Sequence, residues 1–208
     1  EFDHAKADWA KTIVNKVKYL ENVRVRVATN PVMHFDICIV AALHEPELKA
    51  VLALPVDWEE FRLDNDNTHY FRTKFVKEGK ELTVVAAAAV SMGMATSSVL
   101  ATKMLLKFQP KYLTMLGIAA GATDDANYGD ILFADSSYDY GSGKIVNDEE
   151  SGQLFYPDPK YIQTDNGAVH MINNLKLKRL FLDDIKAQWV APKPDTSLNL
   201  HIGPIASG

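Results

Sequence analysis

The chain has 208 residues, of which 47% are hydrophobic and 24% are charged, and its formal net charge is −5. This composition excludes a mainly disordered, collagen-like or coiled-coil chain. The negative charge provides no basic field for nucleic acid or an anionic membrane. No apolar run reaches the roughly 18 residues of a membrane span, and no signal-peptide pattern is present at the N-terminus. The single cysteine, Cys38, lies between isoleucines and is expected to be buried and inert, as in a reducing, cytoplasmic compartment.

The first 34 residues are expected to form a helical connector or the tail of an upstream regulatory domain. Apolar side chains recur at helical spacing from about Ala5 to Leu20, and the pattern breaks at Asn30-Pro31. A short helix with one apolar stripe needs a surface to cover it. We expect it to pack on the main domain, to serve in a dimer, or to connect to an upstream domain.

Residues 35–208 are expected to form the main domain, because apolar strand patterns there alternate with amphipathic helices. The run 36–42 is almost entirely apolar and predicts a strand covered on both faces, followed by a helix that begins around Pro46. The further predicted elements are a hairpin of 70–76 and 82–89, a helix over 95–108, a second buried strand at 112–116, a third strand at 130–134, a helix over 169–182 and a strand at 198–205. Beyond Ser136 the chain turns polar and irregular. The alternation predicts an α/β fold with a mixed or largely parallel sheet.

Several common binding signatures are missing from the sequence. There is no Gly-x-Gly-x-x-Gly fingerprint, no Walker-type Gly-Lys-Ser/Thr and no Gly-x-Ser-x-Gly elbow, and the six histidines are scattered. We therefore expect neither an organic cofactor nor a metal. A receiver-type signalling domain is also disfavoured, because no acidic residue ends the first predicted strand.

Three bends rich in Gly or Ala follow predicted strands, at 41–47, 90–95 and 116–121. Ligands of open α/β sheets bind at the carboxyl ends of the strands, and small residues let the backbone approach them closely. Three such bends at one edge predict a site for a flat or phosphorylated ligand.

These bends, together with Tyr-Gly-Asp-Ile-Leu at 128–132, resemble the nucleoside phosphorylase and nucleosidase superfamily from Phe35 to Gly208. The superfamily includes purine nucleoside phosphorylases and methylthioadenosine/S-adenosylhomocysteine nucleosidase. The resemblance implies a three-layer fold with a central mixed sheet flanked by helices. It also implies cleavage of the ribosyl N-glycosidic bond of a purine nucleoside or nucleotide by a homo-oligomer, either a dimer or a hexamer. Tyr-Asp-Tyr-Gly at 138–141 resembles the branch fused to regulatory or defence modules.

The resemblance also implies roles for particular residues. A Glu after the first strand positions the attacking water, and Glu47 matches best, with Glu45 as the rival because the loop is one residue longer than the usual spacing. Met92 and Gly93 would border the ribose or the 5′ group. The remaining residues expected at the substrate are Ala42, Ile118, Ala119, Ala120 and Ser207. Without the resemblance, Met92 and the small residues would be interpreted as core packing.

Two pairs that the resemblance implies are absent. No Met-Glu for the ribose hydroxyls and no Ser-Asp for the leaving purine follows Gly121, so the fold is expected to be incomplete at its C-terminus and this fragment inactive by itself. No arginine lies in a Gly-rich loop after the first strand, which favours water over phosphate as the nucleophile. The alternatives are a phosphate-dependent phosphorylase and a non-catalytic nucleotide-binding module. The natural protein could also be a defence effector that depletes adenine nucleotides.

Overall fold

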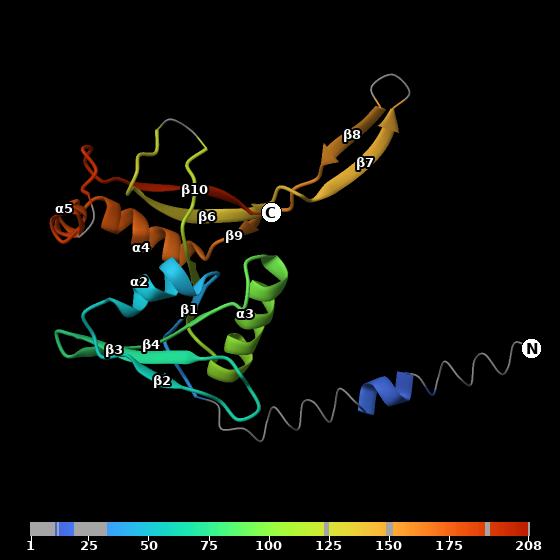
Figure 1. Cartoon of the computed structure of the whole chain (residues 1–208), viewed down its shortest axis with the longest axis horizontal. Helices are drawn as coiled ribbons and strands as arrows, with labels where there is room; N and C mark the ends of the chain where they lie inside the picture. Colours follow the sequence, from blue (N-terminus) through green and yellow to red (C-terminus); the bar gives the residue numbers. More distant parts are fainter. Residues whose placement is uncertain are drawn as a thin grey trace, which may run out of the picture. The chain divides into compact units, whose positions relative to one another are not determined.

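The computed structural model describes residues 11, 13–18, 33–122, 125–148, 152–189 and 192–207. The chain divides into two compact units, Glu1–Gly117 and Ile118–Gly208 (Figure 1). The division falls inside the third predicted bend, within what the sequence pattern predicted as one main domain. The predicted boundary between residues 34 and 35 stays a prediction.

The first unit is built on a five-stranded mixed sheet in the order β2-β3-β4-β1-β5. The central strand β1 runs parallel to both β4 and β5, whereas β3 runs antiparallel to β4 and β2. The strands are β1 (Ile37–Ala41), β2 (Glu59–Phe61), β3 (Tyr70–Lys77), β4 (Lys80–Ala88) and β5 (Tyr112–Leu116). The α/β class and the mixed central sheet predicted for the chain are confirmed.

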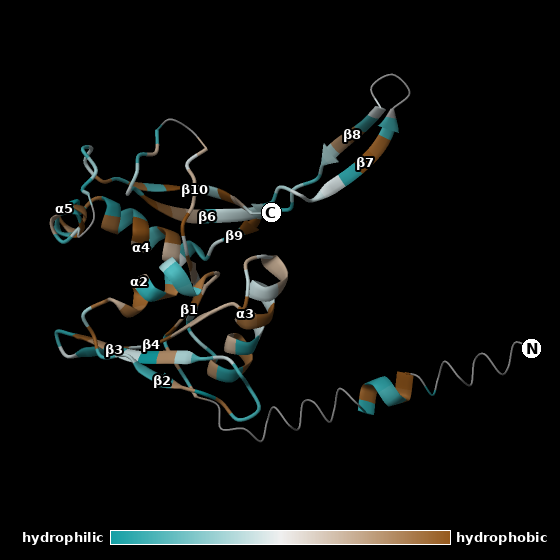
Figure 2. Cartoon of the chain, in the orientation of Figure 1, coloured by the Kyte–Doolittle hydropathy of each residue, from teal (hydrophilic) through white to brown (hydrophobic). Residues whose placement is uncertain are grey.

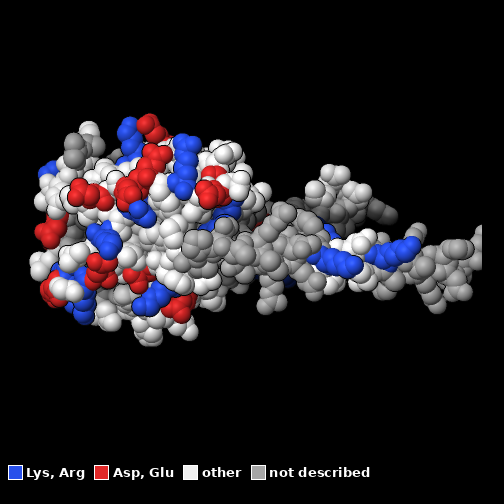
Figure 3. All heavy atoms as spheres, turned by 90° about the horizontal axis from the view of Figure 1, so that it is seen from below, with Lys and Arg blue, Asp and Glu red and all other residues white. Residues whose placement is uncertain are grey.

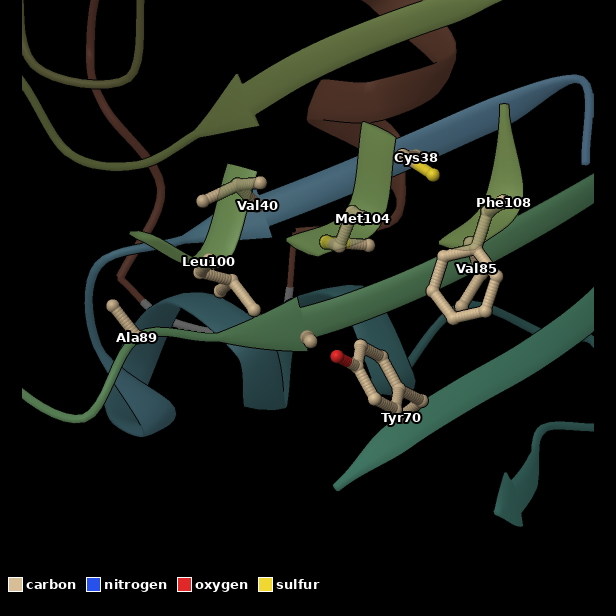
Figure 4. Close-up of a cluster of buried hydrophobic side chains, with 9 residues drawn as sticks. Cys38, Val40, Tyr70, Val85, Ala89, Leu100, Met104 and Phe108 are labelled. Carbon is tan, nitrogen blue, oxygen red and sulfur yellow. The ribbon is translucent and has the colours of Figure 1, made fainter. Parts of the chain in front are cut away.

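Both faces of β1 are covered, as its unbroken apolar run predicted. Cys38 and Val40 pack in one cluster with residues of helix α3 (Met94–Phe108), as Figure 4 shows. Ile39 and Ala41 pack in a second cluster with residues of η1 (His44–Leu48) and α2 (Lys49–Leu52). The unit therefore has three layers, helix–sheet–helix. Burial raises the pKa of the Cys38 thiol to about 12, so the thiol stays protonated, as expected for an inert core residue.

The prediction that residues 112–116 form a buried strand was only half right. They form β5, but all five residues of this strand are exposed. The reason is topological: within the described part of the chain, β5 lies at the edge of the sheet and pairs with β1 alone. An apolar run predicts a strand, but it does not distinguish a central strand from an edge strand.

The second unit contains a three-stranded sheet in the order β10-β6-β9. Its strands are β6 (Ile131–Asp139), β9 (Ile162–Gln163) and β10 (Leu200–Ser207), and β10 runs parallel to β6. A separate antiparallel pair is formed by β7 (Gly143–Asp148) and β8 (Gly152–Pro157). The prediction of irregular structure beyond Ser136 was therefore wrong. Pairing with β10 extends β6 to Asp139, and a local polar composition does not reveal such long-range pairing.

The helix predicted over 169–182 is two helices, α4 (Asn166–Lys176) and α5 (Leu180–Ala187). Asp165 caps α4, because its Oδ1 accepts a hydrogen bond of 2.9 Å from the backbone N–H of Ala168. Figure 2 shows apolar and polar segments alternating along α4. No Gly or Pro marks the break before Leu180, and only Leu182 of the two helices is buried. The break between the two helices therefore has no local signal in the sequence.

The predicted N-terminal helix is described in part, at Lys11 and residues 13–18, which are helical. Its apolar side chains Ile13, Val14 and Val17 are exposed, and the rest of the predicted connector lies outside the described residues. None of the helices in the described part of the chain is long and apolar enough to cross a membrane. Basic and acidic side chains are interspersed on the face shown in Figure 3.

Candidate functional site

The carboxyl ends of three parallel strands in the first unit lie at the same level. In the sheet register, Ala41 at the end of β1 pairs with Ala88 of β4 and with Leu116 of β5. The three bends predicted from the sequence therefore all start from one edge of this sheet. Such an edge is where ligands bind in open α/β folds. We refer to Ala42, the loop 90–93 and Gly117 as the carboxyl edge.

Glu47 is turned back onto this edge. The backbone N–H groups of Ala42 and Leu43 both donate to Oε2 of Glu47, each at 2.9 Å. The chain reaches this geometry through the turn η1, in which the N–H of Leu48 donates to the carbonyl of Leu43 at 3.1 Å. Glu45, inside this turn, has an extended backbone (φ −126°, ψ 132°), so the segment is a wide, kinked turn and not a regular helix. The wide turn has room for the extra residue that the sequence pattern showed in this loop.

Glu45, the rival candidate, lies in a different environment. Its side chain is 74% exposed and pairs with Nζ of Lys49 at 2.8 Å. The hydrogen bond from Lys49 and its positive charge lower the pKa of Glu45. With His44, His69 and Phe71, Glu45 lines an open hollow of about 430 Å³. Of the two carboxylates, Glu47 is the one that is hydrogen-bonded to the carboxyl edge.

The loop 90–93 is held by a residue that the sequence analysis did not single out. Oγ1 of Thr96, in the first turn of α3, donates to the carbonyl of Ser91 at 2.6 Å and lies 3.0 Å from that of Gly93. Gly93 has a φ of +120°, which only glycine adopts readily. Met92 is 68% exposed, so it does not pack in the core of this unit. Thr96 follows Gly93 by three residues, a spacing that could have suggested this staple.

The sequence analysis gave Gly117 no role of its own. In the structure, a Cβ atom on Gly117 would lie 2.6 Å from Oε1 of Glu47. The carboxylate of Glu47 therefore occupies the space where a side chain at this position would lie. No local pattern could have revealed this contact, because it joins residues 70 positions apart in the numbering of the chain.

The other predicted site residues belong to the second unit. Ile118, Ala119 and Ala120 at its start are all exposed. Ser207 ends β10 and pairs with Asp139 of β6, and its carbonyl accepts a hydrogen bond from the N–H of Tyr140 at 3.0 Å. Ser207 therefore lies beside the Tyr-Asp-Tyr-Gly segment, at the carboxyl end of a second parallel pair. The structure thus gathers the predicted residues into two groups, one in each unit.

Asp66 and Asp130 are among the other carboxylates with lowered pKa values, and each joins elements within its own unit. Burial raises the pKa of Asp66, but hydrogen bonds from Lys103, Thr68 and Tyr70 outweigh burial and bring it to about 2. Burial also raises the pKa of Asp130, but hydrogen bonds, including one of 2.8 Å with Nε2 of His201, outweigh burial and lower it. The first network connects the loop before β3 to α3, and the second connects the starts of β6 and β10. Among the residues that the structure describes, no group of three or more His, Cys, Asp or Glu could hold a metal ion.

Comparison with known families identifies the fold. Residues 36–208 match the family model of the phosphorylase superfamily. The chain belongs to this superfamily. The match runs through both units and includes every predicted site residue, so the family resemblance stated from the sequence is confirmed.

Two curated proteins are similar in sequence to this chain. An uncharacterized protein of Sinorhizobium fredii, y4jS, is 26% identical and is matched over 100% of this chain and 52% of its own length. The ATP nucleosidase Cap17 of Escherichia coli is also 26% identical, over 58% of this chain and 25% of its own length. The chain thus spans about half of the first relative and a quarter of the second.

A solved structure shows the same superfamily fold. A mutant of the Helicobacter pylori 5′-methylthioadenosine/S-adenosylhomocysteine nucleosidase, with 5′-methylthioadenosine in its active site, superimposes with a TM-score of 0.56 at 21% identity. The superposition covers 85% of this chain and 65% of that structure. At this identity the similarity establishes the fold.

Proposed function

We propose that the protein is a nucleosidase, which hydrolyses the ribosyl N-glycosidic bond of a purine nucleoside or nucleotide. The observation that carries this proposal is the Glu47 carboxylate, which two adjacent backbone N–H groups hold at the carboxyl edge. The relatives support the reaction class, since Cap17 is an ATP nucleosidase and a structural neighbour binds 5′-methylthioadenosine.

The physics of the reaction explains why a fixed carboxylate matters. The N-glycosidic bond breaks through a ribose with oxocarbenium character, so catalysis needs negative charge close to the sugar and a nucleophile on the face opposite the base. A carboxylate orients a water molecule and accepts its proton as the new bond forms. Since Glu47 is already held by hydrogen bonds, little reorganisation is needed at the moment of reaction. In this mechanism the exposed Met92 and Gly93 border the ribose or its 5′ group.

Water is the proposed nucleophile rather than phosphate. A phosphorylase needs cationic side chains that hold the phosphate, but the described arginines near the sheet of the first unit are engaged elsewhere. Arg72 donates two hydrogen bonds to the carboxylate of Glu59, and Arg62 lies 3.3 Å from Nδ1 of His69. No arginine lies in the three bends.

Turnover also needs an acid that protonates the leaving purine and a group that binds the ribose hydroxyls. The superfamily resemblance assigns these roles to a Ser-Asp and a Met-Glu pair, and neither pair follows Gly121 in these 208 residues. We therefore propose that the 208-residue chain does not turn over by itself, and the test of function uses the intact natural protein. A homo-oligomer and an effector role that depletes adenine nucleotides are part of the same proposal.

The test is release of free purine from ATP, adenosine, inosine and 5′-methylthioadenosine, measured by chromatography with and without phosphate. The expected result is base release without phosphate from at least one substrate, with an unphosphorylated anomeric carbon in the sugar product. Base release that requires phosphate and yields a ribosyl 1-phosphate would overturn hydrolysis in favour of phosphorolysis. Tight binding of a nucleotide without base release would favour the regulatory module, and neither binding nor release would overturn the proposal altogether.

A further inference from the structure

At position 117 a glycine is required by the lack of room for a side chain and not by the backbone conformation. Its φ lies outside the left-handed region that favours glycine, unlike those of Gly93 and Gly129. A Cβ atom built on Gly117 would lie 2.6 Å from Oε1, 3.2 Å from Cδ and 3.6 Å from Oε2 of Glu47. Atoms in folded proteins do not approach this closely without moving. Any side chain at this position would therefore displace the Glu47 carboxylate or itself be displaced.

The sheet register explains why these two residues meet. Ala41 pairs with Leu116, so Gly117 leaves β5 at the level where Ala42 leaves β1. The Glu47 carboxylate lies across both strand ends. Oε2 accepts the two hydrogen bonds from the β1 side, while Oε1 lies against Gly117 on the β5 side. Two N–H donors after β1 thus hold the Glu47 carboxylate on one side, and the absence of a side chain at Gly117 leaves room for it on the other.

We propose that Gly117 is a positioning residue for Glu47: its missing side chain leaves the space in which the carboxylate reaches the backbone N–H groups of Ala42 and Leu43. This inference rests on the proposed role of Glu47 as the group that orients water. A methyl group at Gly117 pushes Oε1 away from β5 and rotates the carboxylate off its donors. Displacement of a catalytic group by about 1 Å costs on the order of 100-fold in rate.

The first measurement is independent of activity and uses thermal unfolding of the intact protein. The variants are Gly117→Ala, Glu47→Ala and the double variant, with Gly203→Ala as the matched control, because a Cβ at Gly203 meets no atom within 4 Å. Gly117→Ala should lower the Tm when Glu47 is present. In the Glu47→Ala background, the same change should leave the Tm unchanged or raise it, because alanine restricts the unfolded chain more than glycine. An equal loss of Tm in both backgrounds would overturn the inference.

The second measurement separates positioning from a general loss of structure. Gly117→Ala should lower kcat about 100-fold with KM within about threefold, while Gly203→Ala leaves both unchanged. In the Glu47→Asp background, whose carboxylate is one methylene shorter, adding Gly117→Ala should cost less than about threefold more. A kcat of Gly117→Ala within about threefold of the wild type would overturn the positioning role. Coupled Tm shifts in a protein that releases no base from any substrate would overturn the proposed function and leave the steric contact supported.

Discussion

The two units both end parallel strands at an edge that carries predicted site residues, yet the two edges are built differently. In the first unit, side chains brace the edge: the Glu47 carboxylate holds the bend after β1, and the Thr96 hydroxyl holds the loop after β4. In the second unit, the β6–β10 edge is held by backbone pairing, with Tyr140 N–H bonded to the carbonyl of Ser207. The Asp139 carboxylate there also accepts hydrogen bonds from the N–H of Gly141 at 2.8 Å and from Oγ of Ser142 at 3.0 Å. Both edges are therefore braced in part by a carboxylate, but Glu47 lies in the bend after β1, whereas Asp139 is the last residue of β6.

Removing the charge of Glu47 is the largest expected effect. Glu47→Gln keeps the size of the side chain but removes the proton acceptor, so kcat of the intact protein should fall roughly 100- to 1000-fold. KM should change little, because the amide still fills the same space. The measurement is base release under saturating substrate.

The matched test of the rival residue is Glu45→Gln. Because Glu45 is exposed and paired with Lys49, its loss should affect kcat far less than the loss of Glu47. If kcat falls in Glu45→Gln but not in Glu47→Gln, Glu45 is the catalytic carboxylate and the assignment of this role to Glu47 is wrong.

The acid stability of the first unit provides the next largest effect. The pKa of Asp66 is lowered from 3.8 to about 2 in the folded protein, and its side chain is only 8% exposed. A carboxylate with a depressed folded pKa stabilises the fold above the unfolded pKa, and this stabilisation is lost as the pH falls through the folded value. Asp66→Asn should therefore lower the free energy of unfolding by about 2 kcal/mol at neutral pH.

The difference between wild type and Asp66→Asn should shrink as the pH falls from about 4 to about 2 and vanish below that range. Thermal unfolding of both proteins across this range is the measurement. A difference that is the same at pH 2 and at pH 7 would show that the network of Asp66 with Lys103 acts through packing and not through charge.

The fold was largely predictable because its strongest signals are local. The apolar run of β1 predicted burial on both faces, and helix α3 was predicted to within one residue at its start and correctly at its end. What could not be predicted depends on partners distant in sequence. The residues of β5 do not reveal that it is an exposed edge strand, and those of β6 do not reveal that it extends along β10.

For the candidate site, the sequence proposes positions but not their arrangement. Spacing left Glu45 and Glu47 as rivals, because a sequence pattern carries no information on the direction of a side chain. The structure distinguishes them: Glu47 accepts hydrogen bonds from the N–H groups of Ala42 and Leu43, whereas Glu45 pairs with Lys49. Gly117 was visible as part of a small-residue motif, but its need for an empty Cβ position arises entirely from Glu47.

A smaller effect is expected from removing the hydrogen bond by which Thr96 holds the loop after β4. Thr96→Val keeps the shape of the side chain but removes the hydroxyl that bonds to the carbonyl of Ser91. Loss of one such hydrogen bond costs about 1 kcal/mol, so KM should rise about fivefold with kcat within about twofold. Thr102→Val, at an exposed position of the same helix, is the matched control and should change neither constant. An unchanged KM for Thr96→Val would show that loop 90–93 does not border the ligand.

The smallest effect tests the second edge. If the hydroxyl of Ser207 bonds to a ribose hydroxyl, Ser207→Ala should raise KM about threefold and leave kcat unchanged, as expected for one neutral hydrogen bond made equally in ground and transition states. Ser197→Ala, at an exposed position before the amino end of β10, is the control. Equal KM values for the two variants would show that the Ser207 hydroxyl does not contact the ligand. A fall in kcat for Ser207→Ala would instead mean that Ser207 takes part in the chemical step.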